Sequence, residues 1–350
     1  MKLLIYADPH WSSYSSIVRS RGEKYSTRLE NLIKTLSWIE VEAITRGCDT
    51  VVCLGDFFDK SELNSEEVTA LQEVGWNELP HWFIVGNHEM GRGNLEHSSS
   101  HLFSLLPTAS VIDEVKFFNT NDTTIVSIPY ILESNRKPLK EYLGNYPLKE
   151  NVIILSHNDI AGIQMGQFVS TTGFSIEEIE ENCNLFLNGH LHNDTEIGKK
   201  IINVGNITGQ NFSEDAFAHS HKAFILDTDE KSLIPIVNPH AMNFYKLDLT
   251  DLRPTIDDVK IQNTLSSLKY PAVATIKINP DINFIVRDLL TTCENIIECR
   301  LITDGVKSDE SIESISNEIN LDHIQKFQMY VMENIGKDEL TLNELERVSK

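Results

Sequence analysis

The amino-acid sequence predicts an α/β fold in which strands and helices alternate. Between the first two of six short apolar runs, residues 28–47 place Leu29, Leu32 and Leu36 at helical spacing, and Gly47 stands where such a helix would end. Strand, helix, strand is the order typical of α/β proteins. The apolar runs have the length and composition of strands buried on both faces. They cover residues 2–7, 50–55, 81–86, 152–157, 185–190 and 201–206.

The composition narrows the class of protein. The length of 350 residues favours two domains, and the net charge of −22 is unfavourable for a protein that approaches DNA unaided. The five cysteines form no Cys-x-x-Cys pair, which favours a reducing compartment. No apolar run is long enough to span a membrane, and the first residues resemble a strand more than a secretory signal. We therefore expect a cytoplasmic protein without a membrane partner.

The chain changes character after residue 242. We expect a first domain over residues 1–242 and a small α+β unit over 243–303, with strands in "YKLDLTDLRP", "AVATIKI" and "IECRLITD" and a helix in "NFIVRDLLTTCENI". Residues 304–350 form an acidic tail, for which the pattern predicts a helix over 321–336. The apolar stripe of this predicted helix consists of Ile324, Phe327, Val331 and Ile335.

Each of the first five predicted strands ends in side chains that can bind a metal ion. Because ligands of open α/β sheets bind beyond the carboxyl ends of strands, we expect these side chains to meet. Alternation along an extended chain would turn Asp8 and His10 to one side, and His190 and His192 likewise, so that both histidines of the latter pair face one cluster. The predicted metal ligands are Asp8, His10, Asp56, Asn87, His157, His190 and His192.

The chemistry of this set indicates a hydrolytic metal site. Carboxylate, amide and imidazole groups suit Mn²⁺, Fe²⁺, Mg²⁺ or a catalytic zinc ion, and do not suit a thiolate zinc site. Seven side chains exceed the needs of one ion, whereas two ions that share a bridging carboxylate would use them all. Two metal ions about 3.5–4 Å apart clamp the attacking and leaving oxygens of a displacement at phosphorus. The sequence therefore predicts phosphoester hydrolysis by a metal-activated hydroxide.

Five motifs, "ADPH", "LGDFFD", "VGNHE", "SHND" and "GHLH", follow one another within residues 1–210. In this order they resemble the calcineurin-like metallophosphoesterases, and the resemblance implies a layered α/β/β/α sandwich. It further implies that His88 protonates the leaving group or stabilises the transition state. Asp59 and Glu89 would orient their neighbours, although both could simply cap turns. One implied metal ion has the ligands Asp8, His10, Asp56 and His192, and the other has Asp56, Asn87, His157 and His190.

Within this superfamily the chain resembles the SbcD-type DNA repair nucleases, a group that includes the recombination nuclease subunit of T-even phages. The motifs start at residue 1, "INVGNITGQNFSED" (202–215) replaces that group's Gly-Ser/Thr loop, and a small α+β cap and an acidic tail follow. The resemblance implies a Mn²⁺-dependent 3′-to-5′ double-strand exonuclease and single-strand endonuclease. It also implies a homodimer in a heterotetramer with an SbcC-type coiled-coil ATPase, docked through the stripe on 321–336, in the host cytoplasm if phage-encoded.

Two other functions stay open. "GNHE" is also typical of Ser/Thr protein phosphatases, so a phosphomonoesterase acting on proteins or small molecules is the alternative. Against it, "GDFFDK" lacks the Arg-Gly that follows the second motif in those phosphatases, and they lack the Gly-His-x-His ending. A scaffold that only binds is less favoured, because degenerate members lose ligands and this sequence keeps them all.

Several basic and histidine residues have two interpretations. The densest positive stretch of the chain lies directly after the first motif, and phosphate contacts or a solvated surface would each explain it. The candidates for DNA contact are Arg19, Arg21 and Asn206, the last standing where the nuclease group often has Ser. We expect His219 and His221 on a solvent loop, and His97 and His101 on a surface helix. His81, His240 and His323 are expected to be structural or exposed. The densest positive stretch also includes Lys24 and Arg28, and a smaller positive stretch consists of Arg136, Lys137 and Lys140.

Overall fold

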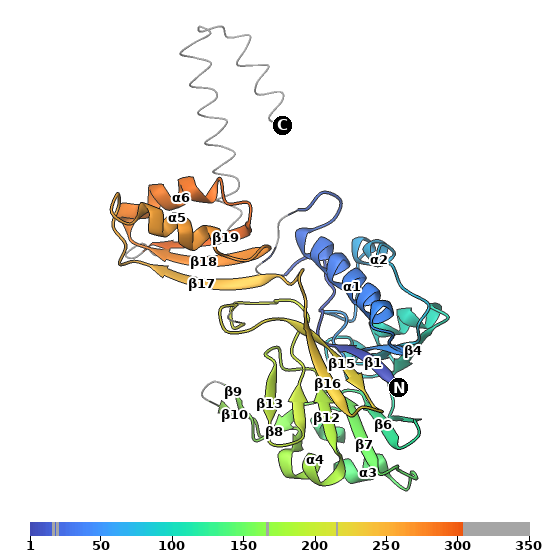
Figure 1. Ribbon diagram of the computed structural model, residues 1–350. Coiled ribbons are helices and arrows are strands. Elements are labelled where there is room, and N and C mark those ends of the chain that lie inside the picture. The colour runs from blue at the N-terminus through green and yellow to red at the C-terminus, as the bar shows by residue number, and fades with distance from the viewer. Residues whose placement is uncertain (16–17, 19–20, 166–167, 215, 304–350) are drawn as a thin grey trace.

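The computed structural model describes residues 1–303, apart from 16–17, 19–20, 166–167 and 215 (Figure 1). Arg19, His323 and the predicted helix over 321–336 lie outside the described residues. No helix among the residues described is long and apolar enough to cross a membrane.

Two six-stranded sheets form the main part of the molecule. In the first, β1 to β4 run parallel, β15 pairs antiparallel with β1, and β16 pairs antiparallel with β15. Its order is β16 (Ser232–Val237), β15 (Lys222–Asp227), β1 (Lys2–Tyr6), β2 (Thr50–Cys53), β3 (His81–Ile84) and β4 (Ala109–Ile112). The runs predicted at 2–7, 50–55 and 81–86 are thus confirmed as parallel neighbours.

The second sheet has a parallel centre and antiparallel edges. Its order is β13 (Thr195–Ile197), β14 (Ile201–Asn203), β12 (Leu185–Asn188), β7 (Asn151–Ser156), β6 (Thr123–Ile128) and β5 (Lys116–Asn119). Two short ribbons lie outside it, β8 (Ile160–Ala161) with β11 (Phe174–Ser175) and β9 (Gln164–Met165) with β10 (Phe168–Val169). The carboxyl ends of β7 and β12 therefore lie side by side.

The two sheets pack face to face and helices cover their outer faces. One buried cluster joins Leu3 and Val52 of the first sheet to Ile153 and Leu187 of the second. The outer face of the first sheet packs against α1 (Thr27–Thr45) and α2 (Ser65–Leu71), and that of the second against α3 (Leu139–Leu143) and α4 (Ile176–Asn182). This order of layers is the predicted α/β/β/α sandwich. Short 3₁₀ helices cover Gly91–Gly93, Ser99–Leu105, Glu133–Asn135 and Pro280–Ile282.

Helix α1 forms where the sequence predicts it. The Ser26 side chain caps its start by accepting a hydrogen bond from the Leu29 backbone N–H. Its apolar positions, including Leu32 and Leu36, are buried against the first sheet. Gly47 follows the helix with a φ of +63°, the left-handed conformation that glycine adopts most readily.

The segment 243–303 is a compact β-α-β-α-β unit. Its three parallel strands have the order β17 (Asn243–Leu249), β18 (Ala272–Ile278) and β19 (Ile296–Thr303). Helices α5 (Asp258–Ser266) and α6 (Asn283–Leu290) lie on the same face of this sheet (Figure 1). The three predicted strands and the predicted helix are present, and α5 is an element that the sequence analysis missed. Met242, Phe244 and Val273 pack with Val18, which joins the unit to the loop after β1.

Candidate metal centre

The predicted ligands come together at the carboxyl ends of β1, β2, β3, β7 and β12. Asp8, His10, Asp56 and His190 all have positive φ values, of 51°, 48°, 46° and 78°. Such values are uncommon for residues other than glycine, and they concentrate at functional sites where the surrounding structure enforces them. Because these residues leave the extended conformation, strand alternation does not decide where their side chains point.

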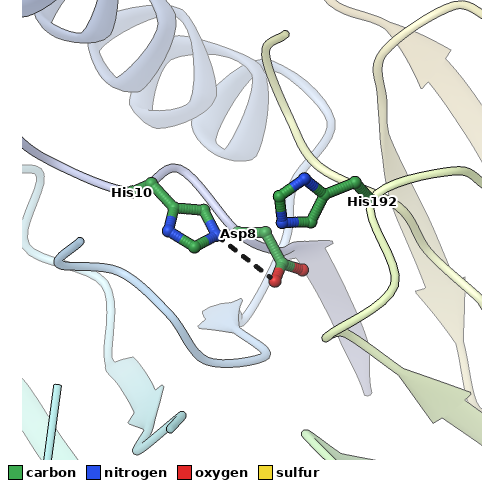
Figure 2. Close-up of side chains that lie close together, drawn as sticks. All are labelled: Asp8, His10 and His192. Carbon is green, nitrogen blue, oxygen red and sulfur yellow. Dashed lines mark ion pairs between the residues drawn. The ribbon is translucent and has the colours of Figure 1, made fainter. Parts of the chain in front are cut away.

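Asp8, His10 and His192 form the first ligand group (Figure 2). One potential ligand atom of each lies within 4.8 Å of the others. His10 Nε2 is 3.9 Å from Asp8 Oδ1, the ion pair drawn in Figure 2, and 3.9 Å from Asp56 Oδ2. Asp8 also accepts hydrogen bonds from the backbone N–H of His190 at 3.1 and 3.2 Å. The first group thus contains three of the four ligands implied for one ion, and Asp56 lies next to it.

Asp56, His157 and His190 form the second ligand group. His157 Nε2 is 3.1 Å from Asp56 Oδ2 and 3.3 Å from Asn87 Oδ1, so Asn87 joins this group. The same oxygen of Asp56 faces His10 of the first group and His157 of the second. This places Asp56 between the groups, where a bridging carboxylate would be. His190 and His192 both face the cluster that the two groups form around Asp56, with His192 in the first group and His190 in the second.

A hydrogen-bond acceptor fixes the outward nitrogen of each of these four histidines. Three acceptors are carboxylates: Asp59 Oδ1 at 3.1 Å from His10 Nδ1, Asp159 Oδ1 at 3.0 Å from His190 Nε2, and Glu214 Oε1 at 2.9 Å from His192 Nδ1. The fourth is the Leu54 carbonyl, which accepts from His157 Nδ1 at 2.7 Å. Such partners set the tautomer and orient a metal-binding imidazole.

The remaining nitrogens are the test of whether the site fits metal ions. His10 Nε2 and His190 Nδ1 are buried and have no hydrogen-bond partner among the residues described. An orphaned buried nitrogen is costly unless something binds it. His10 Nε2 faces carboxylate oxygens of Asp8 and Asp56, and His190 belongs to a group with Asp56, so this set of donors fits divalent cations.

A family model described as calcineurin-like phosphoesterase matches residues 1–194, more than half of the chain. The chain belongs to this family. Metallophosphoesterases use dinuclear metal centres, and the two ligand groups are this phosphoesterase's candidate for one.

Individual relatives of the phosphoesterase are distant. It is 23% identical over 138 residues to "Putative phosphoesterase 244L" of Invertebrate iridescent virus 6, an alignment that covers 39% of this chain and 48% of that protein. The chain thus spans about half the length of this relative. Among solved structures, the protein TT1561 of Thermus thermophilus is 12% identical with a TM-score of 0.40, over 67% of this chain and 98% of that one. A dimetal phosphatase from Danio rerio is 13% identical with a TM-score of 0.40, over 64% and 91%.

His88 of the phosphoesterase lies at the open side of the first group. Its ring is perpendicular to that of His10, with 4.7 Å between centroids, and 43% of its side chain is exposed. Its Nδ1–H donates to the Asp59 carbonyl at 3.0 Å, which orients the ring. The predicted catalytic histidine is therefore close to the ligands and accessible to a substrate.

Glu89 accepts hydrogen bonds from backbone groups near the ligands and contacts no ligand side chain through a hydrogen bond. It is fully buried and accepts hydrogen bonds from the backbone N–H groups of Gly86 at 2.6 Å and Phe58 at 3.1 Å. Burial, and then the negative charge of Asp56, raise its pKa to about 7. Asp59 contacts His10 directly, as predicted, whereas Glu89 fixes the loops that carry Asp56 and Asn87.

Asp56 and His157 form a buried ion pair. Burial alone would lower the pKa of His157, but the carboxylate of Asp56 raises it to about 9. Conversely, burial would raise the pKa of Asp56, and the positive charge of His157 brings it well below its ordinary value. A cation bound here would take the place of the proton on His157 Nε2.

Two further carboxylates of the site escaped the sequence analysis. Asp159 accepts from His190 and from the Tyr130 hydroxyl at 3.1 Å, and Glu214 accepts from His192. Asp159 stands inside the "SHND" motif, a signal that could have found it. Glu214 lies in the segment 202–215 that follows the last motif, but the sequence analysis singled out that segment as a loop and assigned no role to its carboxylate.

The other singled-out residues have varied positions. Arg21 is half exposed and pairs with Glu66 at 2.6 Å, so it remains accessible to a substrate. Asn206 is only 1% exposed and its Oδ1 is 2.8 Å from His221 Nδ1, so the structure does not offer the predicted contact with DNA. Arg28 is buried as well, and its Nη2 donates to the His10 carbonyl at 2.9 Å.

The predictions for the remaining histidines are partly wrong. His221 is buried and does not lie on a solvent loop, because its Nδ1 contacts the carbonyl and the side-chain oxygen of Asn206, at 3.1 and 2.8 Å. His101 lies on the short 3₁₀ helix and is 3.1 Å from Asp113, and His97 precedes this helix. His81 is structural, buried beside Glu40 at 3.1 Å.

Proposed function

We propose that this phosphoesterase is a two-metal DNA nuclease that hydrolyses phosphodiester bonds. The observation that carries the proposal is the position of Asp56, one of whose oxygens faces both ligand groups. With Asp56 shared, the seven predicted ligands match the needs of two divalent ions, for which we propose Mn²⁺.

The ions, when bound, would lower the pKa of water to give a hydroxide nucleophile and neutralise charge on the phosphate. The chain supplies the remaining functions. His88 is exposed beside the first group and would hold or deliver the proton that the leaving oxygen requires. The Asp59 carbonyl accepts from Nδ1 of this ring, which leaves Nε2 for the substrate. Asp59, Asp159 and Glu214 keep the ligand rings in place.

Three features support DNA as the substrate. The segment "INVGNITGQNFSED" (202–215), which follows the Gly-His-x-His motif, occupies the place of a Gly-Ser/Thr loop in the SbcD-type nucleases. A small α+β unit packs against the loop that follows the first motif, in the place of that group's cap. Arg21, on the same loop, is exposed despite its ion pair. The proposed activities are 3′-to-5′ double-strand exonuclease and single-strand endonuclease.

The negative charge of the chain supports the proposal that a partner protein helps it to bind DNA. With a net charge of −22, repulsion would weaken binding to duplex DNA, so a partner with a positive surface would be needed. We propose a coiled-coil ATPase of the SbcC type in a heterotetramer with two copies of this chain. The docking stripe Ile324, Phe327, Val331 and Ile335 rests on the sequence alone.

A comparison of substrates tests the proposal. The purified chain with Mn²⁺ is given end-labelled duplex DNA, circular single-stranded DNA, bis-(p-nitrophenyl) phosphate, p-nitrophenyl phosphate and a phosphopeptide. We expect cleavage of both DNAs and of the diester, with duplexes shortened from their 3′ ends, and no cleavage by Asp56→Asn. Hydrolysis confined to the monoesters would contradict the nuclease and establish the phosphomonoesterase.

A further inference from the structure

We propose that Glu214 is a positioning residue for His192, and that its loop makes the first ligand group depend on the docking of the small unit 243–303. The inference rests on the proposed two-metal hydrolysis and adds to it a route by which a remote part of the chain affects one ion. We call residues 205–214 the linking loop.

Glu214 is held rigidly against His192. It is 2% exposed, and its Oε1 accepts from His192 Nδ1 at 2.9 Å. Two groups of the linking loop hold the carboxylate in turn: the Gln210 backbone N–H donates to Oε2 at 2.8 Å, and Asn211 Nδ2 donates to Oε1 at 3.1 Å. With a proton fixed on Nδ1, His192 presents the lone pair of Nε2 to the first group.

The linking loop also contacts the other two ligands of the first group. Gln210 Nε2 donates to the carbonyls of Asp8 at 3.4 Å and Pro9 at 3.2 Å. Buried Arg28 connects the Gln210 side chain to the His10 carbonyl. The loop therefore reaches the side chain of His192 and the backbone of Asp8, and through Arg28 that of His10.

On its other side, the linking loop is anchored to the small unit. The Phe212 ring packs edge-on against Phe244 of β17, with 5.2 Å between centroids. The Gly209 N–H donates at 3.0 Å to the carbonyl of Met242, the residue directly before the unit. Directly after the loop, the Ala216 N–H donates to the Phe244 carbonyl at 3.2 Å. A Cβ added to Gly209 would lie 2.4 Å from the Met242 oxygen and 2.7 Å from the Phe244 ring, so only glycine allows the loop to approach this closely.

The second group has no such connection among the contacts of the described residues. Asp159, which orients His190, is held by the Tyr130 hydroxyl at 3.1 Å and lies 3.7 Å from Arg136 Nη2. Both partners follow β6 of the second sheet. His157 is held by the Leu54 carbonyl. A displacement of the small unit would thus disturb the first group and leave the second in place.

Substitutions on the two sides of the loop test the inference by Mn²⁺ binding, measured by calorimetry. Glu214→Ala removes the acceptor for His192, and Phe212→Ala removes the ring that docks on Phe244. Each substitution should lower the binding affinity for one of the two ions roughly tenfold or more, the range seen when hydrogen-bond partners of metal-binding histidines are lost. Glu214→Gln and Phe212→Leu, which keep an acceptor and an apolar side chain, should recover most of the affinity.

Three controls assign the effect. Asp159→Ala should lower the binding affinity for the ion of the second group, because Asp159 orients His190. Phe284→Ala removes a ring of the small unit that is 78% exposed and should change neither ion. Combined with His192→Ala, Glu214→Ala should cause no further loss. If Phe212→Ala melts below the assay temperature, Phe212→Leu serves instead and should show a smaller loss at the same ion.

A second readout does not depend on metal or substrate. In metal-free protein with ¹⁵N-labelled histidine, NMR should show the Nδ1–H of His192 in the wild type and in Asp159→Ala, and its loss in Glu214→Ala. Because this result stands whatever the substrate is, it separates failure of the inference from failure of the nuclease proposal. Normal binding of both ions by folded Phe212→Ala, or equal weakening of both, would overturn the inference.

Discussion

The two ligand groups share Asp56 but are held by different parts of the chain. The first, with Asp8, His10 and His192, depends on loops that contact helix α1 and the small unit. The second is supported from within the sandwich, by the Leu54 carbonyl and by Asp159. From this difference we infer that the affinities of the two ions would depend on different parts of the chain, as long as Asp56 stays fixed.

The largest effect is expected where the groups meet. Asp56→Asn removes a negative charge and an acceptor that both groups share, so we expect loss of both ions and hydrolysis at background level. Metal content of the purified protein and cleavage of bis-(p-nitrophenyl) phosphate measure the two effects. Asp251→Asn, a change at an exposed position, is the matched control and should behave as wild type. Retention of one ion at normal affinity would show that the groups are independent after all.

His88→Ala should reduce catalysis without affecting metal binding by either ligand group. Because His88 lies beside His10 and belongs to neither the first nor the second group, we expect both ions to bind normally. The cleavage rate should fall by about 10²–10⁴-fold, the usual contribution of a general acid or base. His97→Ala, an exposed histidine nine residues along the chain, should leave the rate unchanged. Full activity of His88→Ala would require another proton donor.

The second group should give the metal-free protein a distinctive pH dependence. The pKa of His157 rises from 6.5 to about 9 beside Asp56, so protonated His157 stabilises the folded protein. This contribution to the free energy of unfolding is fully present below about pH 6.5 and is lost as the pH rises through about 9. The shift corresponds to on the order of 3 kcal/mol of unfolding free energy. Urea unfolding in EDTA at pH 6.5 and 9.5 measures it.

A matched variant isolates the contribution of His157. The pKa of His192 is also raised, by Glu214 against the effect of burial, and acts in the same direction. His157→Gln should therefore flatten most of the pH dependence and leave a smaller remainder. A wild-type protein whose stability rises between pH 6.5 and 9.5 would contradict the ion pair.

The smallest effect is expected outside both groups. Arg21→Ala should leave metal binding unchanged, since its partner is Glu66 and not a ligand. If Arg21 contacts a DNA phosphate, the slope of log affinity for duplex DNA against log salt should fall by about one. Arg253→Ala, an exposed arginine in the small unit, is the comparison. An unchanged slope would restrict Arg21 to its ion pair.

Much of the fold could be predicted because its signals are local. The short apolar runs and the spacing of Leu29, Leu32 and Leu36 are visible along the chain, and they indicated α1 and most of the central strands. The edge strands of the sheets and α5 were missed, since partly exposed elements carry a weaker apolar pattern. The buried strand β6 was missed as well, because threonine and serine interrupt its apolar run.

In the candidate site, too, the residues within local motifs could be predicted, and those that depend on contacts between distant segments could not. The motifs indicated all seven predicted ligands and Asp59, whereas the positive φ values that direct Asp8 and His190 have no sequence signal in residues other than glycine. Glu214 and His221 act through contacts between distant segments, which only the folded chain brings together. Arg28 looked like a surface cation, and its burial follows from the packing of α1 beneath the first motif.

The most direct test of the central claim is the anomalous scattering of manganese in crystals grown with Mn²⁺. We predict two peaks, one beside Asp8, His10 and His192 and the other beside Asn87, His157 and His190, with a carboxylate oxygen of Asp56 between them. A single peak, or two peaks of which only one contacts Asp56, would contradict the shared centre.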